Sequence, residues 1–161
     1  FAKYTNIADR HIFAMNTSYG YLRNLSKEPL STYTLYRPGG ENTIRGYRYG
    51  QVGTQIVDPT ANPLSPLIVI GGNKQFIANF EYQFKIADQF RTVVFYDLGN
   101  AWALGTKVFH EAPKRSTGVE FRFFLPISPA PLRLIWSRKL NPYPNDPDGR
   151  NDFQFSIGTT F

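Results

Sequence analysis

Oxygen-bearing side chains gather in a proline-rich stretch near the end of the 161-residue chain, and they are the first candidates for chemistry. Carboxylate and amide oxygens are the ligands that calcium prefers. The spacing here does not fit an EF-hand loop, and the same residue types are common in solvated turns. We therefore expect a turn, with no bound metal, at four residues: Asp146, Asp148, Asn151 and Asp152.

Two histidines, His11 and His110, lie far apart in the sequence, and the chain has no cysteine. Neither histidine belongs to a zinc-type motif, so we assign neither as a metal ligand. The sequence also lacks the Gly-x-Ser-x-Gly nucleophile elbow and the phosphate-binding Gly-Lys-Ser/Thr pattern. We therefore expect a chain that is not an enzyme and that holds no metal and no cofactor.

Arginine and tyrosine alternate in the run IRGYRYG at 44–50. An aromatic and basic surface can stack single-stranded nucleic acid, and the net charge of +6, from 18 basic and 12 acidic residues, would favour such binding. The strand pattern described below has no use in a soluble nucleic-acid binder, so we expect no nucleic-acid partner. Basic loops could instead contact anionic lipid headgroups.

The composition departs from that of an ordinary soluble domain, with 42% hydrophobic and 16% aromatic residues alongside 12 Pro and 13 Gly. No apolar run approaches the roughly 18 residues that a membrane-spanning helix requires. Strands of a membrane barrel remain compatible, because they alternate apolar and polar residues and need only about 9 to 11 residues each. The chain begins at Phe1, with neither a start Met nor a signal peptide, and we expect it to be processed or cut from something longer.

The elements that must position the polar residues are strands, because apolar and polar residues alternate with a period of two. The alternation is clear in 75–86 and returns in 117–123, 132–136 and 153–161. In 75–86 one parity is apolar throughout: Phe76, Ala78, Phe80, Tyr82, Phe84 and Ile86. The apolar faces are rich in Phe, Tyr and Trp, which suit a membrane interface better than the inside of a β-sandwich.

Short and long connections alternate along the chain, as they do between the periplasmic turns and extracellular loops of outer-membrane barrels. We predict an all-β fold, an antiparallel transmembrane β-barrel. The expected strands lie near 1–6, 11–24, 73–86, 90–102, 115–126, 131–140 and 152–161. An odd number does not close a single-chain bacterial barrel, so this barrel is expected to be part of a larger or oligomeric one.

The connection at 25–72 exceeds what a compact domain leaves without structure, and loops of that size are usually functional. Its Pro and Gly residues argue against a regular helix. The apolar stretch at 67–70 could extend the following strand past Gly71 and Gly72. We expect a long extracellular loop with a function of its own.

Four segments resemble the BamA and TamA superfamily of outer-membrane assembly factors and its two-partner secretion relatives. ENTIRGYRYG, which contains Ile44, Arg45, Gly46 and Tyr47, resembles the motif of a long loop in that superfamily. GGNKQFIANFEYQF and FRTVVFYDLGNAW resemble the two strands after this loop, and FQFSIGTTF resembles the terminal strand. The order and spacing agree from about residue 11 onward, so the resemblance covers most of the chain.

The resemblance implies that the loop folds into the barrel lumen, where Arg45 meets Glu81 and Asp97 on the inner wall. Both acids lie on the polar parity of their strands. A guanidinium can grip carboxylates with several hydrogen bonds, whereas lysine offers only a point charge. Gly46 would permit a close backbone approach, and Tyr47 would wedge against the wall. Arg45 could anchor the loop or act directly in insertion, and both hypotheses require the same contact.

The last expected strand carries its apolar residues on one face. The resemblance implies that this strand is also a signal that the assembly machinery recognises, and it could pair with a client strand by β-augmentation. The residues of this signal are Phe153, Phe155, Ile157 and Phe161.

The function that the resemblance implies is non-covalent folding and insertion of client β-barrels in the bacterial, or an organelle, outer membrane. The expected partners are outer-membrane lipid and unfolded outer-membrane proteins, with homo-oligomers forming through strand edges. Two further classes stay open: a polypeptide-translocating pore of the two-partner secretion type, and the barrel anchor of a patatin-like lipase. A fourth hypothesis is a structural fragment that completes itself by pairing with another copy.

Overall fold

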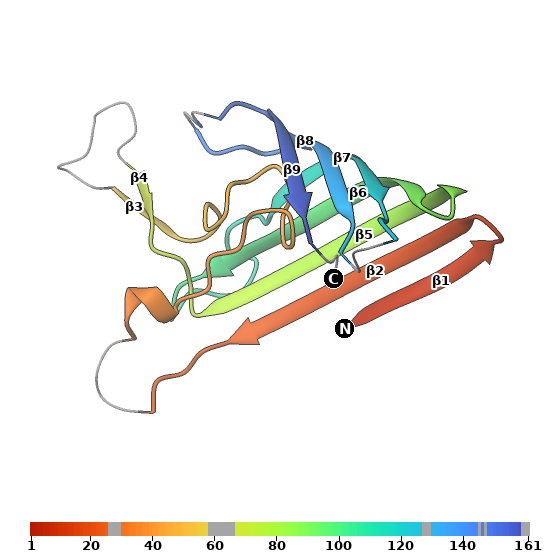
Figure 1. Ribbon diagram of the computed structural model, residues 1–161. Coiled ribbons are helices and arrows are strands. Elements are labelled where there is room, and N and C mark those ends of the chain that lie inside the picture. Colours follow the sequence, from red (N-terminus) through yellow and green to blue (C-terminus); the bar gives the residue numbers. More distant parts are fainter. Residues whose placement is uncertain (26–29, 58–66, 127–129, 145, 147, 159–161) are drawn as a thin grey trace.

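The computed structural model describes residues 1–25, 30–57, 67–126, 130–144, 146 and 148–158. Within these ranges, seven strands form one antiparallel sheet, in which each strand pairs with the next strand of the sheet along the chain (Figure 1). The strands, in sheet order, are β1 (Ala2–Ala8), β2 (His11–Tyr21), β5 (Lys74–Ala87), β6 (Phe90–Trp102), β7 (Lys114–Phe123), β8 (Leu132–Lys139) and β9 (Asn151–Ile157). The prediction of an all-β antiparallel fold is confirmed, with strand ends shifted by a few residues.

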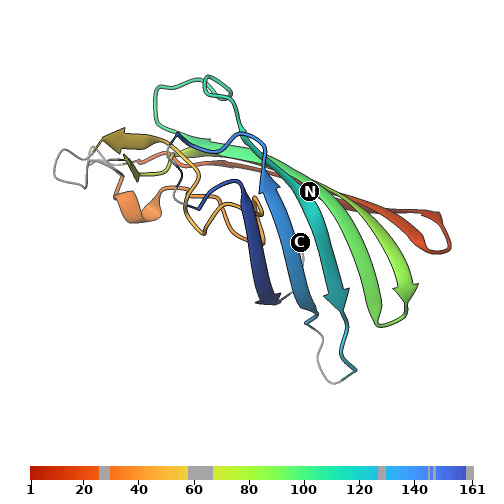
Figure 2. The same ribbon diagram turned by 90° about the horizontal axis from the view of Figure 1, so that it is seen from above.

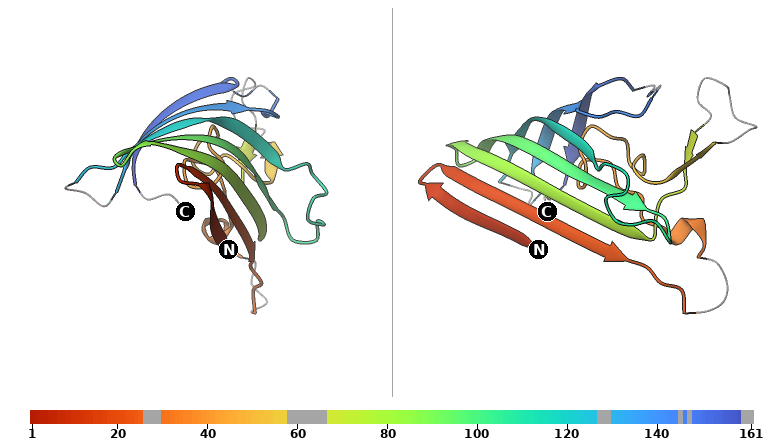
Figure 3. Two further views of the ribbon diagram at one scale, coloured as in Figure 1. Left: turned by 90° about the vertical axis from the view of Figure 1, so that its right-hand side faces the viewer. Right: turned by 180° about the vertical axis from the view of Figure 1, so that it is seen from behind.

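The sheet is strongly curved, and one long segment of chain lies on its concave side (Figures 2 and 3). In the described part of the chain the sheet does not close, because β1 and β9 form its two edges. Its curvature and its meander order are those of an arc cut from an antiparallel barrel. No helix of the described residues is long and apolar enough to cross a membrane.

The two faces of the sheet reverse the usual arrangement of a soluble protein. On the convex face large apolar side chains are exposed, including Trp136 and Phe153, each 67% exposed. On the concave face charged side chains are buried, including Glu81 at 1% and Arg122 at 2% exposure. Exposed apolar patches of this extent are rare on soluble proteins, and apolar-out with polar-in is the pattern of a membrane barrel.

The connection between β2 and β5 contains a 3-10 turn, η1 (Thr32–Thr34), and two short strands, β3 (Gln55–Val57) and β4 (Leu67–Val69). The hypothesis that 67–70 extends the following strand is wrong, because β4 pairs with β3 in a separate two-stranded sheet. Beyond the end of β4 at Val69, Gly71 has a φ of +84°, which turns the chain out of the extended path, and Gly72 then forms a bridge with Tyr36.

Candidate functional site: a loop docked on the concave face

Residues 36–53, called the docked loop below, fold back on themselves beneath the sheet. The amide of Val52 donates to the carbonyl of Pro38 at 2.9 Å, and the amide of Gly40 donates to the carbonyl of Tyr47 at 2.7 Å. These bonds close the loop into a compact shape with Ile44–Tyr47 at its inner end. Loop carbonyls and amides are thereby satisfied internally, which a buried backbone requires.

Arg45 projects from the docked loop into the sheet and is 1% exposed. Its Nε and Nη2 donate to the two oxygens of Asp97, both at 2.7 Å, in a bidentate pair. Its Nη1 donates to Glu81 at 2.7 Å and to Glu120 at 2.8 Å. The backbone amide of Arg45 adds a bond of 3.1 Å to Asp97. One guanidinium therefore joins the loop to β5, β6 and β7.

Two more arginines extend these contacts across the sheet. Arg122 donates to Glu120 at 2.6 Å and to Glu81 at 2.7 Å, while Arg133 donates to Glu120 at 2.7 Å. Arg133 also reaches the docked loop, at the carbonyl of Glu41 and the side chain of Asn42. The result is a charge cluster of three arginines and three carboxylates: Arg45, Arg122, Arg133, Glu81, Asp97 and Glu120.

The charge cluster is formally neutral, and this neutrality reduces the free-energy cost of burying its charges. Burial by itself would lower the pKa of the Arg45 guanidinium, but the Asp97 carboxylate, followed by Glu81 and Glu120, outweighs burial and raises it. An uncompensated charge in the same place would carry a desolvation cost of several kcal/mol, roughly 3 to 5 on loss of one partner. Arg45 thus stays charged, and the loop is held by charge-assisted bonds.

An aromatic ring, that of Phe95, also contacts the Arg45 guanidinium. The Cζ atom of Arg45 lies 3.7 Å from the centre of the Phe95 ring on β6. The ring lies over Gly118 of β7, where an added Cβ would come within 2.8 Å of the Phe95 Cζ atom and 2.0 Å of the Trp136 carbonyl. A side chain at 118 would displace the ring, so Gly118 makes room for the cation–π contact.

The neighbours of Arg45 in the motif also contact the sheet. A Cβ on Gly99 of β6 would come within 3.1 Å of the Ile44 side chain. Gly46 has a φ of +88° and passes so close to β8 that an added Cβ would be 2.9 Å from the Ser137 hydroxyl. The Tyr47 hydroxyl donates to the carbonyl of Asn141 at 3.0 Å. Each residue of 44–47 therefore has its own contact partner on the concave side of the sheet.

The acidic residues considered for calcium form contacts between loops instead. Asp146 accepts a 2.7 Å bond from Lys139 of β8 and a weaker one from Gln51 of the docked loop. Asp148 pairs with the guanidinium of Arg48. These contacts join the connection between β8 and β9 to the docked loop.

The resemblance predicted that Arg45 meets Glu81 and Asp97, and the structure places all three in contact. It did not connect Glu120 or Arg122 to the loop, although both lie on the polar parity of their strand. The alternation of residues along a strand shows which face of the sheet a side chain lies on. It does not show how far along the strands the loop reaches, so it could not predict the contact between Arg45 and Glu120 of β7. The exposed residues Phe153, Phe155 and Ile157 lie on the convex face of β9, and Phe161 lies outside the described residues.

A family model described as the Omp85 superfamily domain matches residues 1–161. The chain belongs to the Omp85 superfamily. The superfamily expected from the sequence motifs is thereby confirmed, and its location is the bacterial outer membrane.

A solved structure agrees in fold with this Omp85 chain. The crystal structure of BamA from Haemophilus ducreyi lacking POTRA domains 1-3 is similar to it, with a TM-score of 0.77 and 23% sequence identity. The match covers 99% of this chain and 34% of that chain, so this chain spans about a third of the length of that structure.

Proposed function

We propose that this Omp85 chain is part of a barrel that folds and inserts other β-barrels into the outer membrane. No covalent step is required, because a client gains free energy by pairing its strands and burying their apolar faces in lipid. The barrel would lower the kinetic barrier. Unfolded outer-membrane proteins are its substrates, and membrane lipid is its solvent.

The observation that supports the proposal is the docked loop, which the charge cluster holds against the strands that lead to β9. In the described part of the chain, no strand pairs with the outer edge of β9. In a complete barrel this last strand would meet the first strand at a seam, and an edge that opens there would template an incoming strand by β-augmentation. The charge cluster joins β5, β6, β7 and β8, so it stiffens the strands behind that edge.

A reconstitution experiment tests the proposal. The full-length protein is placed in lipid vesicles, a small urea-denatured barrel protein is added, and client folding is followed by heat-modifiable gel migration. We expect client folding to be faster than in protein-free vesicles. Equal rates in the two samples would refute the insertion function.

A translocating pore is the main competing function in the same superfamily, and the same vesicles distinguish it. Ion conductance across a planar bilayer is measured in parallel with client folding. A conducting protein that does not accelerate client folding would favour the pore.

A further inference from the structure

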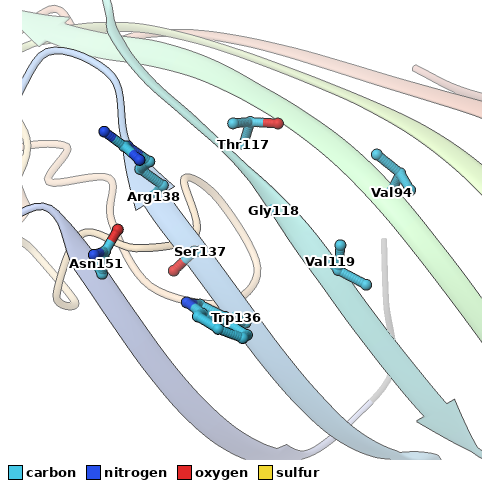
Figure 4. A pocket seen from close by; sticks show the side chains of 8 residues that line it. All are labelled: Val94, Thr117, Gly118, Val119, Trp136, Ser137, Arg138 and Asn151. Carbon is cyan, nitrogen blue, oxygen red and sulfur yellow. The ribbon is translucent and has the colours of Figure 1, made fainter.

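An apolar groove of about 430 Å³ crosses the convex face over β6, β7, β8 and the start of β9 (Figure 4). Its walls are lined by Val94, Thr117, Gly118, Val119, Trp136, Ser137, Arg138 and Asn151. The groove faces away from the docked loop and takes no part in the charge cluster.

The apolar part of the groove is open to the membrane. Trp136 is 67% exposed and Val94 is 51% exposed, although both are large apolar side chains. Figure 4 shows Val94, Val119 and Trp136 along one part of the groove. An exposed surface of this shape and chemistry suits a hydrocarbon chain lying against the strands.

The other end of the groove is basic. Arg138 pairs across the sheet with Thr117 on β7 and with Asn151 on β9, and its side chain is exposed. Within the part of the chain that the structure describes, its guanidinium has neither a hydrogen-bond nor an ion-pair partner. Arg115 lies two residues from Thr117 on the same parity, a diagonal neighbour of Arg138 within reach of one small anion.

The position of this basic end across the membrane follows from the connections. Arg138 lies one residue before the end of β8, beside the long connections 103–113 and 140–150. Long connections of outer-membrane barrels are extracellular, so the basic end lies at the headgroup level of the outer leaflet. A tryptophan one step deeper is the usual mark of that interface.

We propose that the groove binds an anionic phospholipid or glycolipid of the outer leaflet. Its phosphate lies on Arg138 and Arg115, and one acyl chain lies along Val94, Val119 and Trp136. Guanidinium groups bind phosphate with paired hydrogen bonds. The phosphate would therefore neutralise the charge of Arg138, which lies at the edge of the hydrocarbon layer. A free phosphate ion would leave the apolar part of the groove empty, and a protein partner is less suited to a surface embedded in lipid. The inference goes beyond the insertion function and stands without it.

Fluorescence of Trp136 tests the proposal in the full-length protein reconstituted into nanodiscs. The discs contain mostly phosphatidylcholine. One sample adds a low mole fraction of brominated phosphatidylglycerol, and the other adds the same fraction of brominated phosphatidylcholine, so that bromine on the acyl chains quenches the fluorescence. Subtracting the signal of a Trp136→Phe variant isolates this residue. We expect stronger quenching by brominated phosphatidylglycerol than by brominated phosphatidylcholine, with an apparent affinity difference of about fivefold per arginine engaged.

Arg138→Gln should reduce this preference about fivefold, whereas Arg23→Gln, which removes an exposed charge beyond the end of β2, should preserve it. Heat-modifiable migration verifies that each variant is folded. Equal quenching by the two brominated lipids, or equal loss in both variants, would overturn the proposal. Inorganic phosphate at millimolar concentration is then added as a competitor, with chloride of equal ionic strength as its control. If phosphate displaces brominated phosphatidylglycerol and chloride does not, the site binds phosphate without using the acyl chain, and the lipid proposal is overturned.

Discussion

Arg45 makes more charged contacts to the sheet than any other side chain described in the docked loop. Its planar guanidinium serves three carboxylates at once, and a lysine ammonium cannot reproduce the bidentate pair with Asp97. The contact explains why an arginine, and not merely a positive charge, occupies this position.

We expect Arg45→Lys to destabilise the protein and Arg45→Met to destabilise it more, by about 3 to 5 kcal/mol, because three buried carboxylates lose their shared partner. Urea unfolding in detergent measures the free energy, and hydrogen exchange over 36–53 measures loop release. Arg48→Lys is the matched control, since Arg48 has a side chain 74% exposed. A loss in the control as large as that of Arg45→Lys would contradict the role assigned to Arg45.

Gly46 is required for two reasons that a pair of variants can separate. Gly46→Ala introduces strain at φ +88° and a Cβ only 2.9 Å from the Ser137 hydroxyl. Gly105→Ala introduces similar strain at φ +86°, with nothing among the described residues within 4 Å of the new Cβ. Both should lose about 1 to 2 kcal/mol from backbone strain, and Gly46→Ala about 1 to 3 kcal/mol more from overpacking. Equal losses in urea unfolding would rule out the close approach.

At the scale of elements, the charge cluster joins four strands to one loop. Glu120 is shared by Arg45, Arg122 and Arg133, so its loss leaves the cluster with an excess positive charge. The stability of each strand pair therefore depends on charges carried by the others.

We expect the double variant, Glu120→Gln with Arg122→Gln, to lose less free energy of unfolding than the two single variants lose in total. The double change restores neutrality, and residues in one ion network couple by about 0.5 to 3 kcal/mol. The four proteins of the cycle are compared by urea unfolding. Strict additivity would show that the cluster does not act as a unit.

The contact between the docked loop and the connection from β8 to β9 predicts an alkaline transition. The Tyr143 hydroxyl donates to the Gly53 carbonyl and accepts from the Gly53 amide, and burial raises the pKa of this phenol to about 12. A raised pKa means that the folded state favours the neutral phenol. The contribution is complete below the ordinary pKa of 10.0 and is lost as the pH rises through about 12.

Absorbance at 295 nm during an alkaline titration should show a late-ionising tyrosine that is absent from Tyr143→Phe. The variant should also lose less stability than the wild type between pH 10 and 12. Identical titration curves would place Tyr143 in water and contradict the contact.

The sequence predicted the strands and their faces well, because alternation of Phe76 to Ile86 reports directly which side chains meet lipid. It predicted Arg45 with Glu81 and Asp97 only through the resemblance, since a loop contact between distant residues has no local period. Glu120, Arg122 and Arg133 were missed because the register between strands is a tertiary property. The hairpin of β3 and β4 was missed because its two short strands are stabilised by pairing with each other.

At the scale of the whole chain, the described strands form an arc with two edges. In the described residues β1 and β9 each pair on one side only. We expect the isolated 161-residue chain, refolded in detergent, to form discrete oligomers through these edges. Light scattering with detergent correction measures the mass. A folded monomer would contradict edge pairing.

The proposed function places the client strand on the outer edge of β9, so cross-linking from that edge tests it most directly. Single cysteines are placed at Gln154 and Ser156 of the full-length protein, and others along the terminal strand of a client that is folding into vesicles. We expect disulfides at alternating client positions in one antiparallel register, with none to a cysteine placed at Gln83, within the paired strand β5. Client folding without any cross-link to β9, or with equal cross-linking to β5, would contradict the templating of client strands by β9.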